Sequence, residues 1–415
     1  MKHSTRTFSL LVLLSVLITA PAAGQQWTRF RGPNGDGQSD AGTIPATWTT
    51  KDYAWRVKLP GIGCSSPVVS GDKIFITCGI EEDATRIIRC LKISDGGLIW
   101  KRAFESTTHP MHQNNTYCVS TPALDADHVY TSWTTPKEYT VVAMTQEEGR
   151  EVWRRDLGPF ESSHGYGASP MLYDDLLILP NDQLGPSFVI ALDRATGKTR
   201  WKVPRRSVKT AYSTPCIYRP EGGAPQLILT STAHGVTSLD PKTGKQNWEL
   251  EVFDQGIRIV GSPVVASGLI FASAGTGGGG KQMVAIRPGV PEKGAKAEVA
   301  YNLKGSLPYV PTSVAHGKLL FTWSDQGVVT CLDAPTGELH WQQRVGGQFF
   351  GSPIRVGDRL YCISRKGEMV VLAADVKYGL LGKISLEEPS DATPTVVDGV
   401  MYLRTRSHLM ALGEK

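Results

Sequence analysis

Short apolar runs alternate with polar, glycine-containing turns along most of the chain. The clearest unit has an apolar run from Phe188 to Leu192, a polar turn ending at Gly197, and a second run carrying Trp201. Similar strings end at four other tryptophans, and in each the glycine lies four residues before the tryptophan. These pairs are Gly96 and Trp100, Gly149 and Trp153, Gly197 and Trp201, Gly244 and Trp248, and Gly337 and Trp341. Glycine supplies the positive φ of a tight turn, so the spacing predicts repeated β-hairpins with tryptophan on a fixed face.

A second periodic mark is a small residue followed by a proline that opens an apolar run. It occurs at Ser66-Pro67, Thr121-Pro122, Ser169-Pro170, Thr214-Pro215, Ser262-Pro263, Ser352-Pro353 and Thr393-Pro394, with a variant at Pro311-Thr312-Ser313. Proline at the first residue of a strand costs no ladder hydrogen bond. Each unit therefore predicts a four-stranded antiparallel meander of roughly 40 to 50 residues, the size of one propeller blade.

The marks give eight openings but seven complete units. The last unit, which begins at Thr393, lacks a fourth strand, whereas an unpaired strand at residues 53–57 carries Trp55. We therefore predict an all-β, eight-bladed β-propeller over residues 53–415, in which this N-terminal strand completes the last blade and removes an exposed edge.

The tryptophans are expected to be buried between neighbouring blades. The predicted set comprises Trp55, Trp100, Trp153, Trp201, Trp248 and Trp341. Tyr301 takes this place in the fifth blade, and the seventh blade, around Leu380 and Leu381, has no such aromatic residue.

The N-terminal region divides into two parts. Residues 1–24 have a basic start, an apolar core and small residues at the end, which predicts a signal peptide and a periplasmic or secreted protein. In the lead segment, residues 25–52, Trp27, Phe30 and Trp48 are expected to pack across the outside or one end of the ring. Asn34 and Asp36 are compatible with a cation site or with an Asx turn.

Composition narrows the classes of partner. The 415 residues are 40% hydrophobic and 20% charged, and a net charge of +5 without basic runs does not indicate nucleic-acid binding. After residue 24 no stretch is apolar enough to span a membrane. The 7 cysteines leave at least one unpaired, and Cys78 and Cys90 fit either a disulfide or two small buried strand residues.

Two short motifs that could indicate phosphate or metal binding lie in sequence surroundings that do not support these functions. Residues 275–281, GTGGGGK, are followed by Gln282 and a strand pattern, which favours a loop between strands over a phosphate loop. His109 and His112 lie in a polar loop, which favours surface histidines over metal ligands. We expect neither a catalytic set nor a metal site.

One group of residues remains as a candidate binding site, in the loops that should surround one mouth of the central channel. The connections between blades share a face with the loops between second and third strands. The expected ligand-binding or partner-binding rim comprises His112, His164, Tyr166, Arg206, Lys209, Tyr212, Arg258, Tyr309 and Phe350. Aromatic and cationic groups suit an acidic peptide or a planar anion, although an inert solvated rim is the alternative.

The string A-x-D-x-x-T-G-x-x-x-W at residues 191–201 resembles the tryptophan-docking motif of the pyrroloquinoline quinone (PQQ) repeat family. The resemblance covers most of residues 53–412 and implies an eight-bladed propeller. The family includes quinoprotein dehydrogenases, which use PQQ and calcium. It also includes non-catalytic propellers such as the lipoprotein subunit of the outer-membrane β-barrel assembly machine.

This chain lacks the adjacent cysteines of the dehydrogenases, and it has no cysteine before Cys64 that could accept a lipid. The resemblance therefore implies a monomeric, exported scaffold that needs no cofactor and binds an envelope protein or peptide. A PQQ-dependent dehydrogenase acting on alcohols or sugars is the alternative.

Overall fold

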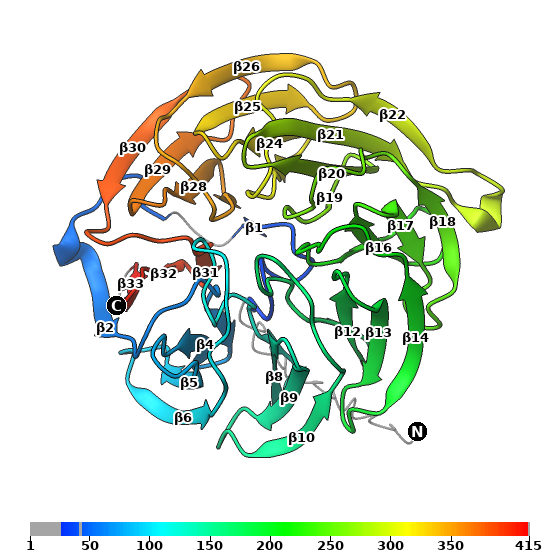
Figure 1. The fold of residues 1–415 in the computed structure, drawn as a ribbon. Coiled ribbons are helices and arrows are strands. Elements are labelled where there is room, and N and C mark those ends of the chain that lie inside the picture. Colours follow the sequence, from blue (N-terminus) through cyan, green and yellow to red (C-terminus); the bar gives the residue numbers. More distant parts are fainter. Residues whose placement is uncertain (1–25, 41–43, 414–415) are drawn as a thin grey trace, which may run out of the picture.

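The computed structural model describes residues 26–40 and 44–413, so the expected signal peptide lies outside the described residues. Within this part, eight antiparallel sheets of four strands stand around a central axis, and one sheet gains a short fifth strand (Figure 1). Apart from two 3₁₀ turns, η1 (Thr50–Asp52) and η2 (Pro291–Lys293), the described regular elements are strands. The predicted eight-bladed propeller is confirmed.

The blades follow one another along the chain. The first four contain β3 (Val68–Ser70), β4 (Lys73–Gly79), β5 (Arg86–Lys92) and β6 (Leu98–Phe104); β7 (Ala123–Leu124), β8 (His128–Thr135), β9 (Glu138–Thr145) and β10 (Glu151–Asp156); β11 (Met171–Tyr173), β12 (Leu176–Asn181), β13 (Ser187–Asp193) and β14 (Thr199–Arg205); and β15 (Cys216–Tyr218), β16 (Gln226–Ser231), β17 (Gly235–Leu239) and β18 (Gln246–Leu250). The last four contain β19 (Val264–Ala266), β20 (Leu269–Thr276), β21 (Gly279–Arg287) and β22 (Glu298–Asn302); β23 (Val314–His316), β24 (Leu319–Trp323), β25 (Val328–Asp333) and β26 (Leu339–Arg344); β27 (Ile354–Val356), β28 (Arg359–Ile363), β29 (Glu368–Ala373) and β30 (Leu380–Ser385); and β31 (Thr395–Val397), β32 (Val400–Arg404), β33 (His408–Leu412) and β2 (Tyr53–Lys58).

The N-terminal strand closes the ring as predicted. Strand β2 pairs antiparallel with β33, and Trp55 lies opposite Ala411. The last blade therefore obtains its outer strand from the opposite end of the chain, which covers the edge that an open array would expose.

The docking aromatics form a repeated contact between neighbouring blades. The indole Nε1 of each donates to a carbonyl in the turn after the third strand of the next blade: Trp55 to Ile93 at 3.0 Å, Trp100 to Gln146 at 2.8 Å, Trp153 to Arg194 at 2.9 Å, Trp201 to Pro241 at 3.1 Å, and Trp341 to Asp375 at 3.0 Å. The Tyr301 hydroxyl donates to Ala334 in the same way. Trp55 is half-buried, whereas the other four tryptophans are buried.

Trp248 departs from this pattern. It is half-buried rather than buried, and its indole donates to the Gln226 side chain of its own blade at 2.8 Å. The Gln226 amide in turn donates to the Gly289 carbonyl of the fifth blade at 2.7 Å. The connection between β21 and β22 contains the extra turn η2, so a side-chain amide joins the two blades there.

The seventh blade lacks the aromatic because its neighbour offers no turn to dock against. Gly382 lies opposite Val371, the position that a tryptophan takes in other blades. A Cβ at Gly382 would lie 2.2 Å from the Ala46 carbonyl, so the lead segment occupies this space. In the eighth blade the third and fourth strands, β33 and β2, come from opposite ends of the chain. The hairpin turn that accepts the docking hydrogen bond in other blades therefore does not join these two strands.

Strand register excludes the disulfide between Cys78 and Cys90. Cys78 lies opposite Ile87, and Cys90 lies opposite Phe75, so the two thiols are not cross-strand partners. All seven cysteines are free, and Cys64 alone among them is not buried.

Residues 27–39 of the lead segment lie against inner strands in the channel, which the prediction for Trp27 and Phe30 did not include, whereas Ala46 packs against the outer strand β30. Strand β1 (Gln38–Ser39) of this segment, which lies near the centre of the ring in Figure 1, adds a parallel strand to β27 of the seventh blade. Trp27, which is fully buried, pairs with Val69 of the first blade. The Thr28 carbonyl accepts from the Leu124 amide of the second blade at 2.8 Å.

Two buried arginines fix this segment across the axis. Arg29 donates to the Pro215 carbonyl at 2.5 Å, and Arg31 donates to the Pro353 and Ser313 carbonyls, both at 2.7 Å. Burial lowers the pKa of both guanidinium groups to about 10. The segment therefore contacts inner strands on opposite sides of the ring and closes the channel below its mouth.

Hydrogen bonds within the protein hold the turn of the lead segment. The Asn34 side chain exchanges hydrogen bonds with the backbone of Ile217, at 3.0 and 3.1 Å. The Asp36 carboxylate accepts from the Gln38 amide at 3.2 Å, which is an Asx turn.

Candidate ligand-binding cavity

A cavity of about 580 Å³ lies at the channel mouth. Its walls come from connections between blades, and from loops between second and third strands such as those holding Thr276, Asp325 and Arg365. Phe30 of the lead segment also lines it. The two kinds of loop share one face, as the sequence predicted.

A belt of hydroxyl groups surrounds the cavity at the start of the inner strands. The backbone amides of the first seven donate to the hydroxyl of their counterpart in the next blade, at 2.9 to 3.2 Å, whereas the buried Ser66 hydroxyl has no hydrogen-bond partner. The series runs Ser66, Thr121, Ser169, Thr214, Ser262, Thr312, Ser352 and Thr393. In the variant Pro311-Thr312-Ser313, Thr312 supplies the hydroxyl, and the proline precedes it instead of following it. The belt explains why the residue before the proline is Ser or Thr, whereas the sequence pattern indicated only a small residue at this position.

Seven of the nine residues expected on the rim line the cavity. They are His112, His164, Tyr166, Tyr212, Arg258, Tyr309 and Phe350. Lys209 and Arg206 do not line it. Arg206 is exposed outside, where its Nη2 lies 2.9 Å from Glu249 and 2.5 Å from Glu251.

Both carboxylates of the cavity wall are already neutralised. Asp325 lies 2.7 Å from Lys281 Nζ and also accepts from the backbone amides of Tyr309 and Val310 at 3.1 and 3.0 Å. Asp391 lies 2.9 Å from Arg365, whose guanidinium stacks over Phe350 at 4.0 Å. These pairs leave little net charge on this side of the cavity.

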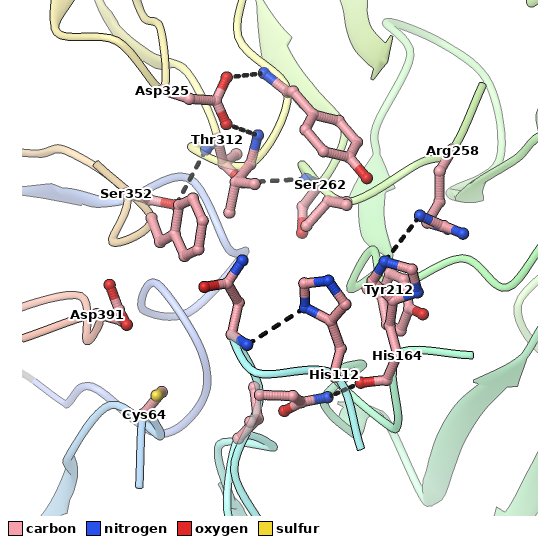
Figure 2. A pocket seen from close by; sticks show the side chains of 18 of the residues that line it. Cys64, His112, His164, Tyr212, Arg258, Ser262, Thr312, Asp325, Ser352 and Asp391 are labelled. Carbon is pink, nitrogen blue, oxygen red and sulfur yellow. Dashed lines mark hydrogen bonds between the residues drawn. The ribbon is translucent and has the colours of Figure 1, made fainter. Parts of the chain in front are cut away.

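Arg258 is the exception, because no carboxylate pairs with it among the described residues. Its Nη1 lies 3.2 Å from His164 Nε2, and its buried Nε has no hydrogen-bond partner (Figure 2). His164 stacks on His112 with ring centroids 4.3 Å apart. Burial, Arg258, His112 and Lys209 together lower the pKa of His164 to about 4, so this imidazole is neutral at pH 7. Arg258 therefore supplies the unbalanced charge of the cavity.

The tyrosines present rings and protonated hydroxyls. The Tyr166 hydroxyl contacts the hydroxyls of Tyr139 at 2.5 Å and Ser132 at 3.1 Å, and burial raises its pKa to about 12. Burial also raises the pKa of Tyr212, whose hydroxyl lies 3.1 Å from Ser162. These groups stay protonated at pH 7 and suit binding rather than proton abstraction.

Phe30 and the two ion pairs are not part of the rim that the sequence predicts. The sequence does carry a signal for one member of each pair. Asp325 and Arg365 occupy equivalent turns in consecutive blades, within Ser324-Asp325-Gln326-Gly327 and Ser364-Arg365-Lys366-Gly367. Such turns lie on the face that carries the cavity.

The wall residues do not fit a calcium-bound quinone. Calcium needs several free oxygen ligands, and both wall carboxylates are engaged by cations and amides. Within residues 26–40 and 44–413, no group of three or more His, Cys, Asp or Glu side chains is placed to hold a metal ion.

The blade repeat, the interblade docking aromatics and the cavity at the channel mouth define a PQQ-like β-propeller. The chain belongs to the PQQ-repeat family described as outer membrane protein assembly factor BamB, whose model matches residues 41–211, 84–297 and 292–412. The described part of the chain contains no helix with the length and apolarity needed to cross a lipid bilayer.

Similarity to individual proteins is distant. Quinohemoprotein alcohol dehydrogenase ADH IIB of Pseudomonas putida is 29% identical over 130 residues, which is 30% of this chain and 18% of that enzyme. BamB from Moraxella catarrhalis has a TM-score of 0.62 at 15% identity, over 87% of this chain and 96% of that one. Quinohemoprotein alcohol dehydrogenase from Comamonas testosteroni has a TM-score of 0.69 at 12% identity, over 95% and 82%. The two solved structures share the fold, and their low identity carries no further conclusion.

Proposed function

We propose that this chain is a non-catalytic binding protein of the cell envelope that captures an acidic segment of another protein in its cavity. The observation that carries the proposal is Arg258, a cation without a carboxylate partner in a wall whose other charges are neutralised. Charge-assisted hydrogen bonds from a guanidinium to a carboxylate are strong and directional. Tyr212, Tyr309 and Phe350 line the same cavity and supply ring surface for the rest of the segment.

The envelope location is supported by two observations. The N-terminal sequence has a basic start followed by an apolar core, which is typical of an exported protein. The family description names an outer membrane assembly factor. We propose that the exported protein acts as a monomer and needs no cofactor.

A second candidate is a PQQ-dependent dehydrogenase acting on alcohols or sugars. The match to a quinohemoprotein alcohol dehydrogenase over 130 residues favours it. The engaged carboxylates of the wall weigh against it, because they offer no set of ligands for calcium.

Calorimetric titration with an acidic peptide tests the binding proposal. The peptide is blocked at both ends and carries internal aspartates. Wild type should bind it, Arg258→Glu should lose most of the binding through charge repulsion, and Arg206→Glu, outside the cavity, should match wild type. Equal binding by the two variants would exclude the cavity as the site. Addition of PQQ and calcium, followed by quinone absorbance and reduction of an electron acceptor by alcohols or sugars, tests the dehydrogenase.

A further inference from the structure

The floor of the cavity restricts the shape of a ligand. Phe30 lines the cavity, and the lead segment beneath it is held to the second blade by Thr28, to the fourth blade by the buried Arg29 and to the sixth and seventh blades by the buried Arg31. A chain therefore cannot pass through the channel. An internal segment would have to enter and leave by the same mouth, whereas a chain end enters once.

The wall also restricts the charge of a ligand. Lys281 and Arg365 are each paired with an aspartate, so neither competes with Arg258 for the anionic group of a ligand. The Nη1 of Arg258 contacts the neutral His164, and a planar guanidinium matches the two oxygens of a single carboxylate. Among the described wall residues, a run of acidic residues would find no second cation without a carboxylate partner.

Size and polarity fit a short piece of backbone. A cavity of about 580 Å³ falls within the usual range of small-ligand sites, and it is too small for a folded domain. The side-chain amides of Gln113, Gln326 and Gln348 line it, and an amide group both donates and accepts, as peptide groups require.

From these three restrictions we propose that the cavity binds the C-terminal end of a protein chain and holds its terminal carboxylate at Arg258. This inference rests on the binding function proposed above and narrows it from an acidic segment to a chain end. The α-carboxylate reaches Arg258, and the last few peptide groups lie against the amides and rings of the wall.

Calorimetry with four probes tests the inference on the intact protein. The first is an N-acetylated pentapeptide ending in leucine with a free carboxylate, and the second is the same peptide with a C-terminal amide. The third is amidated and carries an internal aspartate, and the fourth is N-acetyl-leucine. The free acid should bind roughly tenfold or more tighter than its amide, because only the acid forms charge-assisted hydrogen bonds.

Arg258→Gln should abolish the preference for the free acid, and Arg258→Lys should restore part of it, whereas Arg206→Gln should leave it unchanged. Urea unfolding of each variant shows whether the fold is kept. If the amidated peptide with internal aspartate binds as well as the free acid, the chain-end inference fails and the binding function stands. If N-acetyl-leucine binds as tightly as the pentapeptide, the ligand is a small carboxylate. If no probe binds, both proposals fail.

Discussion

At the scale of single residues, the glycines before the tryptophans have two purposes. Gly149 has a φ of 64°, which the turn requires, and a Cβ at this position would lie 2.6 Å from the ring of Trp100. The glycine of one blade thus makes room for the indole of the preceding blade. The spacing of the sequence predicted the turn, but the close approach of the indole depends on the neighbouring blade.

The docking tryptophans should differ in their contribution to stability. Trp153→Ala should lower the free energy of unfolding by about 3 to 5 kcal/mol, because it leaves a cavity between two blades. Trp248→Ala should cost less, since Trp248 is half-buried and donates within its own blade. Urea unfolding followed by circular dichroism measures both. Equal losses would show that the interblade hydrogen bond does not distinguish these positions.

His164 should make stability depend on pH. Its folded pKa of about 4 lies below the unfolded value of about 6.5, so the unfolded chain takes up the proton first as pH falls. Stability from this group is present above pH 6.5 and is lost between about pH 6.5 and 4. His164→Gln should show a smaller loss over this window than wild type. An NMR titration that places the His164 pKa above 6 would contradict the account.

At the scale of elements, the hydroxyl belt links the starts of the inner strands. Thr214→Val should leave the buried Ser169 amide without its acceptor, now 3.2 Å away, and cost about 1 to 3 kcal/mol. Thr214→Ser keeps the acceptor and is the matched control. Urea unfolding compares the two, and a valine variant as stable as the serine variant would show that the belt adds nothing to stability.

The sequence predicted the elements that depend on local patterns. The strands, the turns and the absent aromatic of the seventh blade follow from spacing within one or two units, and the closure by β2 follows from the count of eight openings and seven complete units. The plug in the channel did not follow, because Arg31 meets its acceptors Ser313 and Pro353 at separations of 282 and 322 residues. The location of Arg206 depended on its outer-strand partners Glu249 and Glu251, which no repeat pattern specifies.

At the scale of the whole molecule, ring closure should control cooperativity. Deletion of residues 50–60 removes β2 and exposes the edge of β33, so the melting temperature should fall and the protein should associate. Deletion of residues 277–278, at the tip of the hairpin between β20 and β21 with nothing near the glycine Cβ positions, is the control. An unchanged melting temperature after the first deletion would refute the closure scheme.

The central claim is that an acidic ligand binds in the cavity at Arg258. The histidine rings report on this directly, because His112 and His164 line the cavity and His340 is exposed on β26, an outer strand. We predict that NMR titration with the acidic peptide will shift the ring signals of His112 and His164 but not that of His340. The shifts should disappear in Arg258→Gln and persist in Arg206→Gln. Unchanged His112 and His164 signals at saturating peptide, or the same shifts in Arg258→Gln, would contradict the account.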